Sequence, residues 1–350
     1  MTHTVIYTPN RYIIPTTWLA QYYGSQTSTN FEVINSNGIL REVNIGNSFT
    51  YGSNGFFNSG TINQTYYFDD SGNLNVAFLN ENISVATRNS LLNIGTSSYS
   101  YFQYIYQSDD LIEGSNGDDL IYGSKGNDVY DGGSGTDILD FNGYAAAISL
   151  DLSTGTVFSA FGNSIIIDIE DVSGTAFADH IVGNAGNNVF QGFGGADIID
   201  GGSGFDTAIY LDATSAVNVN LVTGVTSGGS GADALMSIEK IVGSRFSDIL
   251  TGSNANETFV GGFGNDTIDG SGGIDTVEYG NLGAGVNVNL ITGNSNGGGG
   301  TDQLFNIENV RGSDFADTIT GNGVANLIEG GRGNDLLVAG FGDDGLFGQD

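Results

Sequence analysis

The sequence predicts an all-β protein: a parallel β-solenoid of four 69-residue periods, preceded by a small β-rich N-terminal domain. Three observations predict this class. Glycine makes up 57 of the 350 residues, a segment of 69 residues recurs in strict register, and a nine-residue unit recurs inside it. Glycine supplies sharp turns because it adopts backbone conformations that other residues avoid. Turns at regular spacing over a long chain are typical of stacked coils.

The charge balance restricts the possible partners. The formal net charge is −32, from 40 acidic and 8 basic residues, so a compact fold needs cations among its carboxylates. We therefore expect no binding to nucleic acid and, without a stretch of roughly 20 apolar residues, no membrane insertion. The hydrophobic share of 39% is too high for a disordered acidic tail. The chain has no cysteine, which excludes disulfides and thiolate metal sites.

The 69-residue period is clearest in rows of aspartates, and the periods begin near residues 110, 179, 248 and 317. Each row keeps its spacing through three intervals without an insertion, so the solenoid array is expected over residues 109–350. The rows are Asp110, Asp179, Asp248 and Asp317; Asp128, Asp197, Asp266 and Asp335; and Asp137, Asp206, Asp275 and Asp344.

Within each period, aspartates also recur every nine residues, in units such as GSKGNDVYD and GGSGTDILD. The unit is G-G-x-G-x-D-x-U-x, where U is a large apolar residue. Its first half predicts a turn and its second half a short strand whose apolar side chain points into the core. The inward residues include Ile121, Tyr130, Leu139, Ile199, Ile268 and Leu337.

The remaining part of each period alternates apolar and polar residues, as in VNVNLVTG at 217–224 and VNVNLITG at 286–293. Alternation with a period of two predicts half-buried strands. Each period therefore combines a run of tight coils with one wider coil, for which the sequence predicts two strands.

The nine-residue unit has the chemistry of a calcium site. Its glycines let the backbone turn so that carbonyl oxygens face inward, and its aspartate adds a charged oxygen. A hard cation such as Ca²⁺ takes roughly 6 to 8 such oxygen ligands. Units on alternating sides of the solenoid bring aspartates 18 residues apart into register along one edge. Without cations, the resulting rows of like charges would repel each other. The alternative is that these turns only cap a metal-free solenoid, because aspartate favours turns in any case.

From residue 109 to the end, the sequence resembles the RTX (repeats-in-toxin) β-roll, whose signature is this nonapeptide. The resemblance implies a calcium ion between a turn and the turn two units on. The first turn offers its second and fourth carbonyls and its aspartate, and the second offers its first and third carbonyls and its aspartate. It also implies an exported, extracellular or cell-surface bacterial protein that binds about two calcium ions per period.

Carried over residue by residue, the resemblance assigns ligands to every period. The best match joins Ser115, Gly117 and Asp119 with Gly132, Ser134 and Asp137. The other expected ligands are Asp110, Gly123, Lys125 and Asp128; Asp179, Gly192, Gly194, Asp197, Gly201, Ser203 and Asp206; Asp248, Glu257, Gly261, Phe263, Asp266, Gly270, Gly272 and Asp275; and Asp317, Gly330, Arg332, Asp335 and Asp344.

Some positions depart from the pattern. The place of Asp119 is taken by Asn188, Glu257 and Asn326 in the later periods, and the place of Gly117 by Ala255 and Val324. We expect the affected sites to be weaker or empty.

Residues 1–108 lack the nonapeptide and carry most of the tyrosine in a mixed β pattern. Asp70-Ser71-Gly72 predicts a hairpin turn, and residues 81–94 a short helix. This segment loosely resembles the small β domains that precede RTX arrays. It is expected either to cap the open end of the solenoid or to attach the protein to a surface or a second copy.

No catalytic constellation is apparent, and we expect no enzyme activity. The chain has two histidines, and His180 stands where other periods have Ile249 and Thr318, which favours an ordinary strand position. GNSNG at 293–297 fits a hydrolase motif and GFGDDG at 340–345 a dinucleotide motif, but neither has the required strand–turn–helix context.

Three functions remain open. The first is a secreted structural or surface protein, a matrix, layer or filament subunit that folds on meeting external calcium and binds itself. The second is the RTX portion of a larger type I-secreted enzyme or toxin. The third is an adhesin whose tyrosine-rich N-terminal domain binds a cell-surface glycan. The N-terminus lacks the features of a cleaved signal, and the array reaches the last residue without a cap, so we expect export without cleavage and a truncated array.

Overall fold

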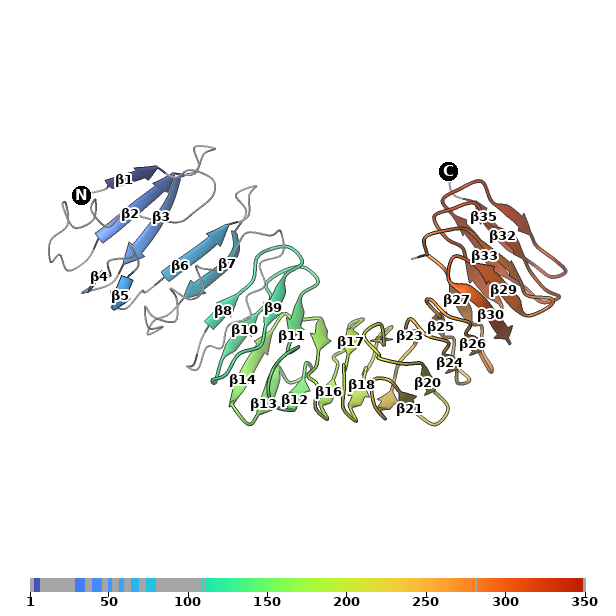
Figure 1. The fold of residues 1–350 in the computed structure, drawn as a ribbon, viewed down its shortest axis with the longest axis horizontal. Helices are drawn as coiled ribbons and strands as arrows, with labels where there is room; N and C mark the ends of the chain where they lie inside the picture. The colour runs from blue at the N-terminus through green and yellow to red at the C-terminus, as the bar shows by residue number, and fades with distance from the viewer. Residues whose placement is uncertain are drawn as a thin grey trace. The chain divides into compact units, whose positions relative to one another are not determined.

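The computed structural model describes Asp109 and residues 111–280 and 282–348. Of the preceding part it describes only the backbone of seven strands. The chain forms two compact units, one of Met1–Asp140 with Thr156–Ile169 and one of Phe141–Gly155 with Glu170–Asp350. Figure 1 shows the strands of each unit.

The described residues form strands, turns and bends, without a helix, so the all-β prediction is confirmed. No helix that is long and apolar enough to cross a membrane occurs in the described part of the chain.

Within each unit, the strands of the nonapeptides alternate between two sheets, which we call the short sheet and the long sheet. All strand pairs of the short sheet within a unit are parallel. In the first unit this sheet comprises β9 (Leu120–Tyr122) and β11 (Ile138–Asp140). In the second it comprises β15 (Asp171–Ser173), β17 (Val189–Gln191), β19 (Thr207–Ile209), β23 (Lys240–Val242), β25 (Thr258–Val260), β27 (Thr276–Glu278), β31 (Asn309–Arg311), β33 (Leu327–Gly331) and β35 (Gly345–Gly348).

The long sheet mixes parallel and antiparallel pairs. In the first unit it comprises β6 (Gln64–Phe68), β7 (Leu74–Leu79), β8 (Leu111–Glu113), β10 (Val129–Asp131), β13 (Thr156–Ser159) and β14 (Gly162–Ile167). In the second it comprises β12 (Ile148–Asp151), β16 (His180–Val182), β18 (Ile198–Asp200), β20 (Val217–Asn220), β21 (Val225–Gly228), β22 (Ala234–Met236), β24 (Ile249–Thr251), β26 (Thr267–Asp269), β28 (Val286–Asn289), β29 (Asn294–Gly297), β30 (Gly300–Phe305), β32 (Thr318–Thr320) and β34 (Leu336–Val338).

The predicted 18-residue register is confirmed in both sheets. In the long sheet, for example, Ile181 pairs with Ile199, and in the short sheet Phe259 pairs with Val277. These apolar residues are at most 2% exposed, since each inward side chain packs on its equivalent in the next coil. Of the six expected inward residues, five are buried, and Leu337 on β34 is half-buried. The stack of apolar rungs therefore forms the core and fixes where each turn lies.

The wide coil differs from the prediction of two strands. In the second unit it adds three strands to the long sheet: β20 pairs antiparallel with β21, and β21 with β22, as do β28, β29 and β30 in the next period. The middle strand, VTSG or NSNG, is largely polar, so its sequence resembles a loop. Its backbone hydrogen bonds to both neighbours nevertheless make it a strand.

This insertion makes the two sheets unequal. From β23 to β30, one period contributes five strands to the long sheet (β24, β26, β28, β29, β30) and three to the short sheet (β23, β25, β27). Because neighbouring strands lie about 4.8 Å apart, the long sheet is longer by roughly 10 Å per period.

The N-terminal strands are β1 (His3–Ile6), β2 (Thr29–Ile34), β3 (Leu40–Ile45), β4 (Thr50–Tyr51) and β5 (Phe57–Ser59), followed by β6 and β7. The predicted hairpin is confirmed, because β6 and β7 flank the Asp70-Ser71-Gly72 turn and pair antiparallel. Strand β7 then pairs with β8, the first strand of the array. The helix expected at 81–94 lies outside the described residues.

Candidate metal centre

The turns of the array are of two kinds. In the first turn of a pair, such as 183–188, the second and fourth residues have ordinary negative φ. In the turn 18 residues later, the same positions are left-handed, as at Gly202 (φ 91°) and Gly204 (φ 134°). At the second and fourth positions, a left-handed backbone therefore favours glycine only in the following turn. Ala255 and Val324 occupy first turns and have no positive φ, so the loss of glycine there does not disturb the backbone.

In first turns, the aspartate is held by its own turn. The backbone N–H and the hydroxyl of Ser244 donate to the two oxygens of Asp248, both at 2.6 Å. Ser313 holds Asp317 in the same way, at 2.6 and 2.7 Å. The second position of these turns is Ser, Thr or Asn, and in most of them its side chain also forms a hydrogen bond with the carboxylate or amide in the sixth position.

In following turns, the aspartate is held by the previous turn. Its Oδ1 accepts the backbone N–H of the residue 18 positions earlier, and the distances lie between 2.8 and 3.0 Å. The aspartate pairs expected from the 18-residue spacing are therefore neighbours. The pairs are Asp119 with Asp137, Asp179 with Asp197, Asp248 with Asp266 and Asp317 with Asp335; Asn188 with Asp206, Glu257 with Asp275 and Asn326 with Asp344 occupy the departing positions.

The second oxygen of many following aspartates has no hydrogen-bond partner among the described residues. In four of these aspartates the oxygen is buried and the whole residue is at most 1% exposed. The four are Asp197, Asp206, Asp266 and Asp275. The same oxygen of Asp335 is also buried and unpartnered. A buried carboxylate oxygen without a partner is costly, so a cation there would stabilise the fold.

Oxygens of both turns converge over the first glycine of the pair. A Cβ atom built on Gly243 would lie 2.6 Å from Asp248 Oδ2 and 2.7 Å from Gly261 O. On Gly174 it would lie 2.7 Å from Asp179 Oδ2 and 3.0 Å from Gly192 O. Only glycine tolerates this close approach, which brings a carboxylate of one turn and a carbonyl of the other to the same residue. This donor set fits Ca²⁺, which prefers hard oxygen ligands.

The electrostatics agree with this assignment. Burial, and then the carboxylates of Asp233 and Asp179, raise the pKa of Asp197 from 3.8 to about 7. Burial and the carboxylates of Asp302 and Asp248 raise the pKa of Asp266 to about 7. Such groups hold a proton in place of a cation, and a divalent ion would replace that proton. No group of three His, Asp or Glu side chains suited to a metal occurs among the described residues, and the ligand set of the RTX repeat draws most of its oxygens from backbone carbonyls.

Several expected ligands differ from this pattern. Asp128 Oδ2 accepts hydrogen bonds from the hydroxyls of Ser124 and Tyr130, both at 2.9 Å. The equivalent oxygens of Asp197 and Asp266 have no such partner. Lys125, Phe263 and Arg332 occupy the third turn position, where the resemblance assigns only the carbonyl. Asp110 lies outside the described residues.

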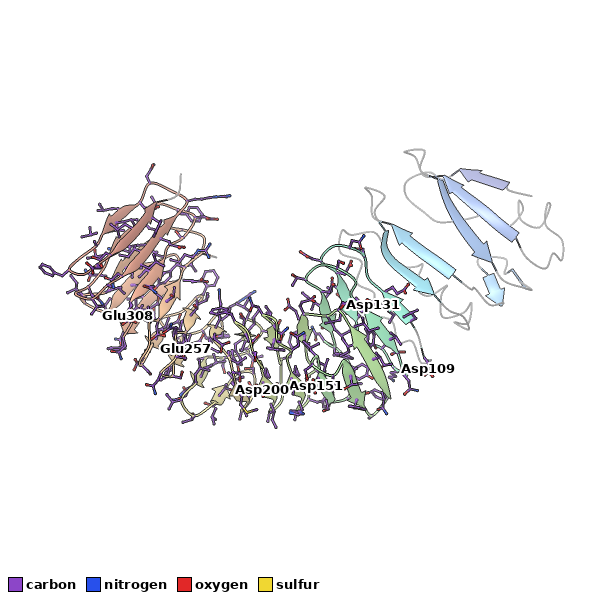
Figure 2. The ribbon with its side chains drawn as sticks, turned by 180° about the vertical axis from the view of Figure 1, so that it is seen from behind. Asp109, Asp131, Asp151, Asp200, Glu257 and Glu308 are labelled. Carbon is purple, nitrogen blue, oxygen red and sulfur yellow. The ribbon has the colours of Figure 1, made fainter. Side chains whose placement is uncertain are left out.

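The substituted positions keep part of the pattern. Asn188 Nδ2 donates to Glu170 O at 2.6 Å, and Asn326 Nδ2 to Glu308 O at 2.7 Å, so each amide makes a contact that a carboxylate could not. Glu257 accepts from Ser253 with one oxygen and leaves its Oε2 buried and unpartnered. Glu257 therefore still offers a charged ligand, and reduced binding at the two Asn positions stays a prediction. Glu257 and Glu308 are labelled in Figure 2.

The sequence reasoning missed four acidic residues of the wide coils. Asp233 and Asp302 accept the backbone N–H of Asp197 and Asp266, both at 3.1 Å. They therefore continue the row of carboxylates along the solenoid edge that carries Asp197 and Asp266. They end further nonapeptide turns, GGSGADALM at 228–236 and GGGGTDQLF at 297–305. Glu239 and Glu308 continue the row on the opposite edge, which carries Asp206 and Asp275. The 69-residue repeat could have revealed all four, but their spacings of 36 and 33 residues hid them from a search at 18.

The catalytic motifs have no support in the geometry. His180 is an exposed residue at the start of β16, as expected for a strand position. The GFGDDG segment leads into strand β35 and not into a helix.

A comparison with protein families finds the RTX calcium-binding nonapeptide repeat in four copies, at residues 105–139, 173–208, 239–281 and 311–346. A search of curated proteins finds no match. The four copies coincide with the turn pairs described above, and the repeats are calcium-binding. The chain therefore carries four RTX calcium-binding nonapeptide repeats, and the array that contains them is a calcium-binding β-roll.

Proposed function

We propose that this protein is an extracellular structural or surface protein whose β-roll folds when it binds external calcium. The observation that carries the proposal is the row of buried carboxylate oxygens without hydrogen-bond partners, at Asp197 and Asp266 on one side and at Asp206 and Asp275 on the other. Together with a net charge of −32, these oxygens favour an unfolded chain wherever calcium is scarce.

This coupling suits export. A chain that stays unfolded at low internal calcium can pass a type I channel and fold outside, where calcium is plentiful. RTX repeats support an extracellular location. We include in the proposal a role without catalysis, in a matrix, layer or filament formed with further copies of the chain.

Circular dichroism in calcium and in chelator tests the folding step. We expect a β spectrum in millimolar calcium and a largely disordered spectrum in chelator. Identical β spectra in both conditions would contradict the proposal. Electron microscopy of the same samples tests the structural role, because ordered assemblies in calcium support it and isolated particles under all conditions oppose it.

A further inference from the structure

Each wide coil ends in a short turn whose first residue has a left-handed backbone: Ser237 (φ 52°) and Asn306 (φ 50°) in the second unit, and Asp168 (φ 46°) in the first. This conformation costs a non-glycine residue roughly 1–2 kcal/mol. Its recurrence at 69-residue spacing indicates that the turn serves a purpose. The carbonyl oxygens of Ser237 and Asn306 lie directly over Gly201 and Gly270, the first glycines of the preceding nonapeptide turns.

A glutamate follows two residues after each of these left-handed residues. Glu239 Oε2 accepts the backbone N–H of Asp206 at 2.8 Å, and Glu308 Oε2 accepts that of Asp275 at 2.9 Å. The same hydrogen bond joins consecutive nonapeptide turns, as between Asn188 N and Asp206 Oδ1 at 2.8 Å. The glutamate thus takes the position of the aspartate in the next turn, although its segment is not a nonapeptide.

An unpartnered carboxylate oxygen faces this turn. Asp206 and Asp275 are 0% exposed, and their Oδ2 atoms have no hydrogen-bond partner among the described residues. A Cβ atom on Gly201 would lie 2.6 Å from Asp206 Oδ2, and one on Gly270 would lie 2.5 Å from Asp275 Oδ2. The aspartate oxygen and the wide-coil carbonyl therefore lie close to the same glycine, as Asp248 Oδ2 and Gly261 O do in a nonapeptide pair.

We infer that the two short wide-coil turns that begin at Ser237 and Asn306 hold two further calcium ions, one in each turn. One ion lies between Asp206 Oδ2, the carbonyl of Ser237 and the carboxylate of Glu239. The other lies between the Asp275 oxygen, the carbonyl of Asn306 and the carboxylate of Glu308. Water completes the coordination, as is common for Ca²⁺. The inference rests on the proposed calcium binding and extends it to segments without the repeat signature.

The opposite row lacks this arrangement. Asp233 Oδ2 accepts the hydroxyl of Thr226 at 3.0 Å, and Asp302 Oδ2 that of Ser295 at 2.6 Å. In the first period, Val157 and Ser164 replace the hydroxyl and the carboxylate. Because these carboxylates already accept hydrogen bonds from hydroxyls, the inference is limited to the turns that contain Glu239 and Glu308.

The test counts calcium ions per folded chain by native mass spectrometry. The variant E239Q/E308Q removes two charges but keeps an oxygen that can accept the N–H of Asp206 and Asp275. We expect two fewer ions than in the wild-type protein, and one fewer in each single variant. A control, E113Q/E329Q, removes the same charge from strand residues that are not among the proposed ligands and should bind as many ions as the wild type.

An unchanged count in folded E239Q/E308Q would overturn the inference, because it would leave the glutamates a structural role only. Should that variant fail to fold, anomalous difference maps of wild-type crystals grown with manganese decide. Peaks beside Ser237 O and Asn306 O support the sites, and their absence while nonapeptide turns show peaks opposes them. A wild-type chain that binds no calcium would instead contradict the proposed function.

Discussion

At the scale of single residues, the two kinds of turn explain which positions demand glycine. Following turns use left-handed residues in the second and fourth places, and glycine fills most of them. The second place is Phe193 (φ 63°) in one such turn and Ser271 (φ 67°) in another. Both residues are held in a conformation that disfavours a side chain, so these turns carry local strain.

We predict that Phe193→Gly and Ser271→Gly stabilise the calcium-bound array by about 1 kcal/mol each, less the entropy that glycine adds to the unfolded chain. Urea unfolding in millimolar calcium measures the change. Phe177→Gly is the control, because Phe177 lies in a first turn with negative φ and should lose stability instead. Equal effects at Phe177 and Phe193 would show that φ is not the cause.

Removing one charged oxygen should weaken its pair of turns. We predict that Asp266→Asn binds fewer calcium ions than the wild type and needs a higher calcium concentration to fold, because Asp266 Oδ2 is the buried, unpartnered ligand. Calcium titration followed by circular dichroism measures the midpoint. Asp314→Asn, at an exposed turn position, should leave the midpoint unchanged. A shift of equal size in both variants would indicate a general charge effect.

At the scale of elements, the tight coils could be predicted closely and the wide coils only in part. Nonapeptides repeat both the turn glycines and the inward apolar residue, so they fix the register of rungs such as Ile181 on Ile199. Strands β21 and β29 carry no such signal. Their pairing depends on the backbones of both neighbours, and this tertiary information is absent from the local sequence.

The ligands of the candidate site were likewise predictable in the tight coils and not recognised in the wide coils. The pairs at 18-residue spacing were predictable because two identical units form each of them. Glu239 and Glu308 were missed because their turn has a different sequence and lies 33 residues after its partner; only their 69-residue spacing marks them in the sequence.

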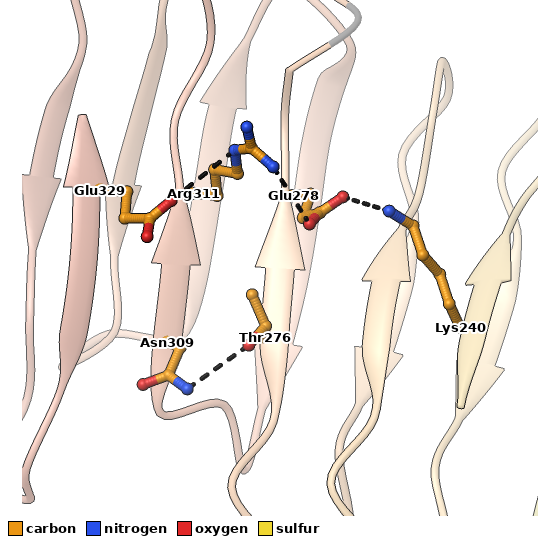
Figure 3. Close-up of polar contacts among 6 residues, drawn as sticks. All are labelled: Lys240, Thr276, Glu278, Asn309, Arg311 and Glu329. Carbon is orange, nitrogen blue, oxygen red and sulfur yellow. Dashed lines mark hydrogen bonds and ion pairs between the residues drawn. The ribbon is translucent and has the colours of Figure 1, made fainter. Parts of the chain in front are cut away.

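Ion pairs link strands of the short sheet across a period boundary (Figure 3). Glu278 on β27 contacts Lys240 at 2.5 Å and Arg311 at 3.8 Å, and Arg311 contacts Glu329 at 3.7 Å. Lys240, Glu278 and Arg311 line a cavity of about 520 Å³ together with Arg332. Because the chain has only 8 basic residues, this cluster holds an unusual share of its positive charge.

We predict that Glu278→Gln lowers the free energy of unfolding by at most about 1 kcal/mol, as for other partly exposed ion pairs. The loss should shrink in high salt, because salt screens the pairs it removes. Thermal unfolding at two salt concentrations, with calcium held saturating, checks this. A loss that does not depend on salt would point to packing and not to charge.

At the scale of the whole molecule, acidity and folding are linked. The pKa values of Asp197, Asp266 and Asp275 are raised to about 7, mainly by burial, against 3.8 for an ordinary aspartate. A raised pKa means that the folded, calcium-free chain binds these protons more tightly than the unfolded chain does. Protonation therefore favours folding.

We predict that the calcium-free array gains stability as the pH falls below about 7 and reaches its full gain below the ordinary value near 3.8. In calcium the trend should reverse, since protons compete with the ion for the same carboxylates. Circular dichroism from pH 8 to pH 5, with and without chelator, separates the two trends. Parallel curves in both series would show that these carboxylates do not exchange protons for calcium.

The two oxygens of a following aspartate such as Asp197 serve different junctions. One accepts an N–H from the coil before, as in the bond from Asp179 N to Asp197 Oδ1, and the other faces its own turn unpartnered. An ion that orders one junction thereby positions a ligand for its neighbour, in the manner of nearest-neighbour coupling in repeat proteins. The array should consequently respond to calcium cooperatively, with a transition steeper than independent sites of equal affinity would give.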